Sequence, residues 1–195
     1  VDLMRIGDMI GVVSYSSSAS VNYGLTKIIP ASVPFFSQRD DRWKNDPIID
    51  EEGKVCGTIG NEFNNPIGCA MTSTAMILKY YGVDTDPREL NDWLNKNSGY
   101  DKGGYLKWEK VTEYAEEKGV EISWIDNRGT DTWRFQDDQP KHWNKLKEEI
   151  DKGYPVIVEV DFNPATPKLQ SHWVLVTSFE GGNINDPANY HINDP

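Results

Sequence analysis

The sequence predicts an α+β fold, because segments with helical patterns come first along the chain and apolar strands follow them. Four helices are expected between residues 70 and 153, and strands are expected at 154–162, 171–179 and 189–194. A chain of 195 residues with 37% hydrophobic side chains can bury a core without disulfide or metal support. We therefore expect the N-terminal helices to pack on an antiparallel sheet.

The first two helices have clear end signals. Residues 70–81 carry apolar side chains at helical spacings along one side, and Gly82 suits the position just past the helix end. The second helix is expected after Asp86, which is a good N-cap. Pro87 fits the first helical position, and Glu89 completes a capping pattern.

The later helices and strands are predicted from their apolar patterns and from the glycines that end the helices. Helices are predicted at 106–119 and 142–153, and each closes on a glycine. The runs "YPVIVEVDF" (154–162) and "SHWVLVTSF" (171–179) are short and apolar, as buried strands are. The stretch 50–68 is rich in Gly and Asn and is interpreted as a loop.

Composition and charge exclude several functions. The net charge of -11 argues against nucleic acid or an anionic membrane as the main partner, because both bind basic surfaces. No apolar run approaches the roughly 20 residues of a membrane span. Two cysteines and three histidines are too few for a cysteine-rich zinc site.

Cys69 stands at the start of the first expected helix, directly after Gly68, which permits close approach of the backbone. A cysteine nucleophile reacts as the thiolate, and a helix N-terminus favours that form through its partial positive charge. The same helix start offers N–H groups for a developing oxyanion. A packed cysteine without chemistry explains this local pattern equally well. Cys56 is expected to be a structural or incidental thiol.

Three histidines are candidate bases. His142 begins a charged, amphipathic helix, which favours a capping or solvated side chain, and His191 lies between Tyr and Ile near the end of the sequence. His172 begins the apolar run "HWVLVTSF", where a polar side chain needs a hydrogen-bond partner. We therefore prefer His172 as the base, although a histidine without chemistry is the alternative at this position.

An acid that orients the imidazole would complete such a site. Two strands of about seven residues joined by a tight turn place residues about 16 apart opposite each other. Asp186 follows His172 by 14 residues and Asp194 follows it by 22. If the six residues "INDPAN" (184–189) form an inserted hairpin tip, the second separation falls to 16. The spacing favours Asp194 directly across from His172 and leaves Asp186 as the alternative.

The order of "PFFSQ", "IGCAMTSTAMILKYYGV", "DPRELNDWL", "SHWVLVT" and "INDP" resembles that of C39-like peptidases of the papain-like superfamily. The resemblance implies a papain-like fold with Cys69 as the nucleophile and His172 as the base. It implies an orienting Asp in an "INDP" motif, either Asp194 or Asp186. It also implies that the amide of Gln38 helps to form the oxyanion hole, although the insertion "DEEGKVCGTIG" separates Gln38 from the cysteine.

The resulting interpretation is a cysteine peptidase that cleaves a peptide or amide bond and needs no metal or organic cofactor. The resemblance implies a peptide substrate, with peptidoglycan stem peptides or cross-bridges as the suggested class. It also implies an extracellular or cell-wall location, in a secreted or phage-associated protein. An amidase or acyl transferase with the same triad is an alternative, as is a catalytically inactive binding module on this fold.

The resemblance assigns residues 31–195 to the peptidase domain. Residues 1–30 are interpreted as a linker or appendage, with a Ser-rich stretch at 14–20. The run "MRIGDMIGVVSYSSSAS" faintly resembles the last hairpin of a bacterial SH3 domain of the wall-binding kind. On that basis, residues 1–30 are expected to be a remnant of such a module or a simple linker.

Overall fold

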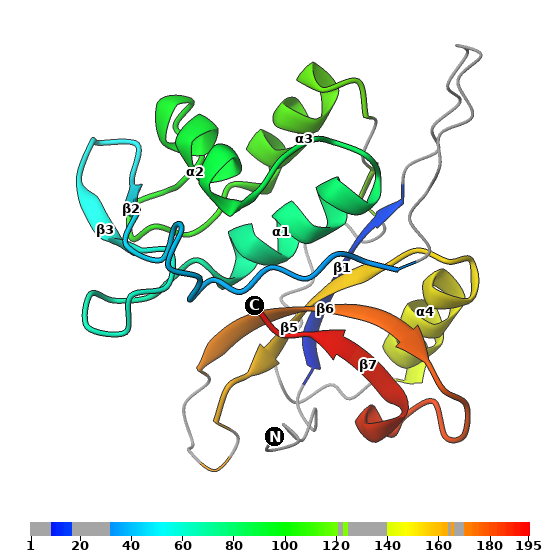
Figure 1. Ribbon diagram of the computed structural model, residues 1–195. Coiled ribbons are helices and arrows are strands. Elements are labelled where there is room, and N and C mark those ends of the chain that lie inside the picture. The colour runs from blue at the N-terminus through cyan, green and yellow to red at the C-terminus, as the bar shows by residue number, and fades with distance from the viewer. Residues whose placement is uncertain (1–8, 17–31, 121–122, 125–139, 164, 166–169) are drawn as a thin grey trace. The chain divides into compact units, whose positions relative to one another are not determined.

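The computed structural model describes residues 9–16, 32–120, 123–124, 140–163, 165 and 170–195 (Figure 1). The chain divides into two compact units. The helical unit comprises Ser17–Ser123 with Pro195, and the sheet unit comprises Val1–Ser16 with Trp124–Asp194. Helices and antiparallel strands both occur, so the predicted α+β class is confirmed, whereas the papain-like arrangement of these elements stays a prediction.

The helical unit contains three of the helices that the structure describes. They are α1 (Cys69–Tyr80), α2 (Pro87–Lys96) and α3 (Trp108–Glu117). Helix α2 contacts both α1 and α3, and it also contacts strand β2 (Pro47–Ile49). Figure 1 shows these helices in green, beside the cyan hairpin of β2 and β3.

Strand β3 (Val55–Thr58) pairs with β2 in an antiparallel hairpin. The prediction of a loop over 50–68 was therefore wrong for these residues. Strands of three and four residues are too short to show a period, and Gly57 within β3 weakens the sequence signal further. The hairpin matters for the site because residue 59 continues directly from β3 toward the start of α1.

Helix α1 is buried over nearly its whole length, since residues 70–78 are all buried. The sequence predicted burial of one side only, because Thr72, Ser73 and Thr74 interrupt the apolar pattern on the other side. Small hydroxyl side chains occupy this core in two ways: Thr74 donates to the Ala70 carbonyl at 2.8 Å, whereas the Thr72 Oγ1 has no hydrogen-bond partner among the described residues. A helix enclosed on all sides holds its first residue in a fixed place.

The predicted helix ends are confirmed. Gly82 has φ +82°, and its N–H donates to the Lys79 carbonyl. The following N–H, of Val83, donates to the Leu78 carbonyl, and this pair of hydrogen bonds defines a Schellman motif. The Asp86 carboxylate accepts the N–H of Glu89 at 2.9 Å, as the capping pattern predicted.

The sheet unit is built on one sheet with strand order β4-β1-β5-β6-β7. Its strands are β1 (Met9–Ser16), β4 (Ser123–Trp124), β5 (Val156–Asp161), β6 (Ser171–Phe179) and β7 (Tyr190–Asn193). Helix α4 (Pro140–Asp151) contacts β1, β5 and β6. Its Trp143 and Leu146 pack against strand valines such as Val158 and Val174. The three strands that the sequence predicted are β5, β6 and β7.

The first strand lies in the segment that was interpreted as a linker or appendage. Met9–Ser16 pairs antiparallel with β5, with Val12 across from Val158. This strand is therefore part of the main sheet, although alternation in "MIGVVSYS" is too weak to predict it. The other residues before 32 lie outside the described part of the chain, so the boundary at residue 31 stays a prediction.

The buried Asn91 of α2 links three parts of the helical unit, which gives a stability test. Its Nδ2 donates to the Pro47 carbonyl at 3.0 Å, and its Oδ1 accepts the Tyr100 hydroxyl at 2.8 Å. We expect Asn91→Ala to lower the free energy of unfolding by about 2 kcal/mol, because the enclosed Tyr100 hydroxyl loses its acceptor. Urea unfolding measures this, with Asp92→Ala on the exposed side of the same helix as a control that changes by less than about 0.5 kcal/mol.

Candidate active site

Cys69 is the first residue of α1, and its thiol is free and half-buried. Gly68 occupies the N-cap position, so no side chain caps the helix, and the first turn contains no acidic residue. The N–H groups of the first helical turn point out of the helix, and their partial positive charge favours a thiolate or a bound anion. The local structure therefore suits a nucleophile.

Gly68 lies against the backbone of Ile59, as the prediction of a close approach requires. Its N–H donates to the Ile59 carbonyl oxygen at 3.0 Å. A Cβ at residue 68 would lie 2.4 Å from that oxygen and 2.8 Å from the Ile59 Cα, which no side chain could tolerate. The segment before Cys69 is thus locked to the strand that leaves the β2–β3 hairpin.

Gln38 is held by the very next residue, Gly60. A Cβ on Gly60 would lie 1.9 Å from the Gln38 carbonyl oxygen and 2.4 Å from its carbon. The dipeptide Ile59–Gly60 therefore touches Gln38 on one side and Gly68 on the other. Through these two backbone contacts, the insertion between Gln38 and Cys69 ties them together instead of separating them.

The Gln38 side chain is buried, with 7% of its surface exposed. Its Oε1 has no hydrogen-bond partner among the described residues. A buried amide oxygen without a partner inside the protein is unusual and requires an explanation, such as a role in catalysis. This is consistent with an amide that meets a substrate atom.

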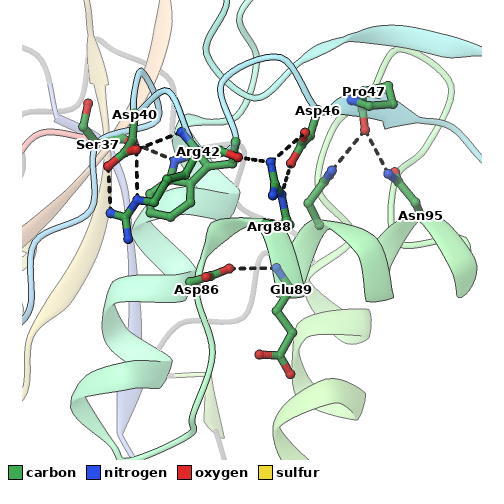
Figure 2. Close-up of polar contacts among 11 residues, drawn as sticks. Ser37, Asp40, Arg42, Asp46, Pro47, Asp86, Arg88, Glu89 and Asn95 are labelled. Atoms are coloured by element: carbon green, nitrogen blue, oxygen red, sulfur yellow. Dashed lines mark hydrogen bonds and ion pairs between the residues drawn. The ribbon is translucent and has the colours of Figure 1, made fainter.

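The segment around Gln38 is stiffened from within (Figure 2). The Trp43 Nε1–H donates to the Ser37 carbonyl at 2.8 Å, and the Arg42 guanidinium stacks 4.2 Å from the Trp43 ring centre. Arg42 also binds the Asp40 carboxylate, at 3.0 Å from Nε and 2.7 Å from an Nη. The hydrogen bonds from Arg42 lower the pKa of Asp40 to about 2, so this ion pair persists at neutral pH.

The same segment is clamped to α2 (Figure 2). The Arg88 Nε donates to Asp46 at 2.8 Å, and its guanidinium also reaches the Arg42 carbonyl. Asn95 donates to the Pro47 carbonyl at 2.9 Å, beside the bond from the buried asparagine of the same helix. Gln38 therefore rests on a segment fixed by α2 at one end and by Gly60 in the middle.

His172 is the second residue of β6 and is 8% exposed. Its Nε2 lies 2.7 Å from the Asp194 Oδ1. The Phe162 ring packs edge-on against the imidazole, with ring centres 5.5 Å apart. A buried imidazole held by a carboxylate and by an aromatic ring has a fixed orientation, which a proton-transfer group requires.

Asp186 and Asp194 have different surroundings. Asp186 caps the short 3-10 helix Pro187–Asn189 and accepts the Ala188 N–H at 3.0 Å. The segment "INDPAN" lies in the connection between β6 and β7, as predicted. Of the two acids, Asp194 is the one that contacts His172.

The predicted register was wrong in detail. Leu175 pairs with Asn193, so continuing this register places Asp194 level with Val174, two residues along β6 from His172. Residues two apart on a strand point to the same face, so the carboxylate reaches the imidazole diagonally. A bulge beside Ser178 and the 3-10 helix shift the pairing, and a count of residues from the sequence cannot include them.

The remaining candidates have other surroundings. The exposed His191 contacts the Glu180 carboxylate at the far end of the same hairpin. The side chain of His142 lies outside the described residues. Cys56, in β3, is a free thiol whose Sγ lies 3.5 Å from the carboxylate of Asp50 in the connection between β2 and β3. Sequence reasoning missed Gly60, whose only signal was a second glycine in "GTIG".

A family model described as the Peptidase C39 like family matches residues 31–195. The chain belongs to this family. Comparisons with curated proteins and with solved structures found no match to the chain. Membership of the Peptidase C39 like family indicates a peptidase and a peptide substrate. Among the helices that the structure describes, none has the length and hydropathy to cross a membrane.

The contact between Gly60 and Gln38 gives a second test. We expect Gly60→Ala to lower the free energy of unfolding by about 2–3 kcal/mol, because the new Cβ forces the Gln38 backbone away. Gly119→Ala is the comparison, since Gly119 has φ +77° but open space around a Cβ. Its cost is the backbone strain alone, about 1 kcal/mol. Urea unfolding of both variants checks this, and equal losses would contradict the steric argument.

Proposed function

We propose that the protein is a cysteine peptidase in which Cys69 is the nucleophile, His172 the general base and acid, and Asp194 the orienting carboxylate. The observation that carries this proposal is the 2.7 Å contact between the buried His172 Nε2 and Asp194. Family membership over residues 31–195 supports the assignment of the chemistry to peptides. The proposal requires that the Cys69 sulfur and a ring nitrogen of His172 come within hydrogen-bond reach of each other in the working enzyme.

The contact with Asp194 assigns the two ring nitrogens of His172. A carboxylate accepts hydrogen bonds, so the His172 Nε2 carries a proton and donates a hydrogen bond to Asp194. In the neutral ring, Nδ1 then has the lone pair, and this nitrogen takes the proton of the Cys69 thiol. The resulting imidazolium is stabilised by the Asp194 carboxylate, while the start of α1 stabilises the thiolate.

The reaction then follows with balanced atoms and electrons. The thiolate sulfur of Cys69 forms a bond to the carbonyl carbon, and the carbonyl π electrons move to the oxygen. When this tetrahedral intermediate collapses, the C–N bond breaks and Nδ1–H of His172 protonates the leaving amine. Water enters, gives its proton to Nδ1, and attacks the thioester carbon. The C–S bond breaks, which releases the acid and restores the thiolate.

Gln38 is proposed to stabilise the oxyanion together with the backbone N–H of Cys69. The first N–H groups of a helix have no partner within that helix, so the N–H of residue 69 can donate to the oxyanion. The Gln38 amide would supply the second donor through Nε2. Its support is the fixed position of the Gln38 backbone beside Gly60.

For the substrate within the peptide class we propose peptidoglycan stem peptides or cross-bridges, at an extracellular or cell-wall location. This part rests only on the resemblance of the sequence to C39-like peptidases. Digestion of purified peptidoglycan, followed by mass spectrometry of the released peptides, tests it directly. Release of new amino termini supports the proposal, whereas cleavage of soluble peptides alone restricts the proposal to a general peptidase.

The nucleophile can be tested with both cysteines. We expect Cys69→Ser to abolish peptide turnover and to leave the fold intact, because the change in volume is small and the serine hydroxyl ionises far less readily. Cys56→Ser should retain full turnover. Iodoacetamide at neutral pH should label Cys69 faster than Cys56, as mass spectrometry would record. Faster labelling of Cys56, or turnover by Cys69→Ser, would contradict the assignment.

The two aspartates form a matched pair for the orienting acid. We expect Asp194→Ala to lower kcat by about 100-fold or more, because the imidazole loses the partner that fixes its tautomer. Asp186→Ala should change kcat by less than about threefold, since only the cap of a short 3-10 helix is lost. A severe defect in Asp186→Ala with near-normal Asp194→Ala would remove Asp194 from the triad and leave the cysteine chemistry in place.

A further inference from the structure

A pocket of about 240 Å³ opens in the helical unit beside the segment that carries Gln38. Its lining comes from two stretches of chain and consists of Arg39, Lys44, Gly60, Asn61, Glu62 and Phe63. Neither the triad nor the proposed oxyanion donors include any of these residues.

The pocket shares its backbone with the proposed oxyanion donor. Arg39 directly follows Gln38 in the sequence, and Gly60 lies in contact with the Gln38 carbonyl. Ile59, the residue before Gly60, contacts the segment that leads into Cys69. The pocket therefore lies beside the backbone of Gln38, the residue proposed to hold the carbonyl of the substrate.

The walls of the pocket are held by internal hydrogen bonds. The N–H groups of Gly60 and Asn61 both donate to the Lys44 carbonyl, at 3.0 and 2.9 Å. The Asn61 Oδ1 accepts the Phe63 N–H at 3.0 Å, and its Nδ2 donates to Asn45 at 2.7 Å. The two stretches are thus joined into one built cavity.

The charges of the pocket are opposite to those of the chain. Arg39 and Lys44 line it with a single acid, Glu62, in a protein whose net charge is -11, and Lys44 also pairs with Asp41, which does not line the pocket. Arg39 and Glu62 are 3.8 Å apart, and their side chains are 60% and 61% exposed. A long, exposed ion pair of this kind contributes little, so an incoming carboxylate can replace Glu62 beside Arg39.

One large apolar side chain, Phe63, lines the pocket. Phe63 exposes 87% of its surface, more than any other large hydrophobic residue among those described. Phe63 lines the same pocket as Arg39 and Lys44, so the pocket combines an apolar contact with positive charge. The aliphatic stem and carboxylate of an acidic residue match that combination.

We propose that this pocket is a subsite for a carboxylate of the peptide substrate, with Arg39 as its principal ligand and Lys44 as a second cation. This inference rests on the proposed peptidase function, because it identifies the occupant as a substrate residue near the scissile bond. The carboxylate belongs either to an acidic side chain or to a free C-terminus, and the two sources present the same planar pair of oxygens to the guanidinium.

Binding can be measured without turnover by using the full chain with Cys69→Ser. The probes are fluorescein-labelled peptides of otherwise uncharged sequence, each with a single Glu at a different position. Each is compared with the peptide that has Gln at that position. A second arm compares a free C-terminal carboxylate with a C-terminal amide. Fluorescence anisotropy gives the Kd of each, and we expect one carboxylate to tighten binding by about tenfold.

Arg39→Gln and Lys102→Gln form the matched variants. Lys102 is also a solvent-exposed cation of the helical unit, paired with Glu52 and outside the pocket. We expect Arg39→Gln to remove the advantage of the carboxylate while binding of the Gln or amide peptide stays within about twofold. Lys102→Gln should preserve the advantage. The arm that shows the effect identifies the source of the carboxylate.

The outcomes separate this subsite from the peptidase itself. The subsite is rejected if no peptide binds, if no carboxylate tightens binding, if the advantage survives Arg39→Gln, or if Lys102→Gln removes it equally. Peptide turnover by the unmodified chain without any preference for a carboxylate rejects the subsite and keeps the peptidase. An Arg39-dependent preference in a chain that cleaves no peptide keeps the binding site and rejects the catalytic proposal.

Discussion

The backbone contacts of Ile59 and Gly60 are the constraint on which the candidate site depends. Two consecutive residues meet Gly68 on one side and Gln38 on the other, and neither contact leaves room for a Cβ on the glycine involved. Because Ile59 and Gly60 are covalently joined, their close backbone contacts fix the start of α1 and the Gln38 segment relative to each other. Such close-packed backbone contacts yield less than hydrogen bonds between flexible side chains. The buried helix behind Cys69 and the clamp from Arg88 then hold the two segments in place.

In the sheet unit, His172 is positioned by strand pairing and by side-chain contacts. His172 lies on a strand, so its Cα is fixed by pairing with β5, where Val160 is its partner. The orientation of the ring comes from the Asp194 carboxylate and the edge-on Phe162. Backbone placement and side-chain orientation are therefore supplied separately. Removal of the Asp194 carboxylate is therefore expected to change which ring nitrogen of His172 carries the proton, while the pairing of β6 with β5 is kept.

Local chemistry in the sequence predicted local structure well. The Asp86 cap, the Gly82 helix end and the strand at 171–179 each depend on residues a few positions apart. Cys69 and His172 also followed from local signals and the family resemblance, whereas the preference for Asp194 over Asp186 came from a count of residues across the hairpin whose register was wrong in detail. What the sequence could not supply was non-local. The enclosure of α1 depends on what surrounds Thr72 and Ser73, and the importance of Gly60 depends on a distant carbonyl that only the folded chain brings into contact.

The two "INDP" copies in the last hairpin have the same letters and different environments. The first ends in a cap of a 3-10 helix, and the second carries the carboxylate that meets the imidazole. An alignment of relatives that contain a single copy would have to choose one of these tetrapeptides, and identity of sequence offers no basis for the choice. The aspartate of the first copy has a local role of its own, because it caps the 3-10 helix. Transfer of residue roles between relatives by motif matching therefore also requires a comparison of strand pairing, because the motif alone does not distinguish the two copies.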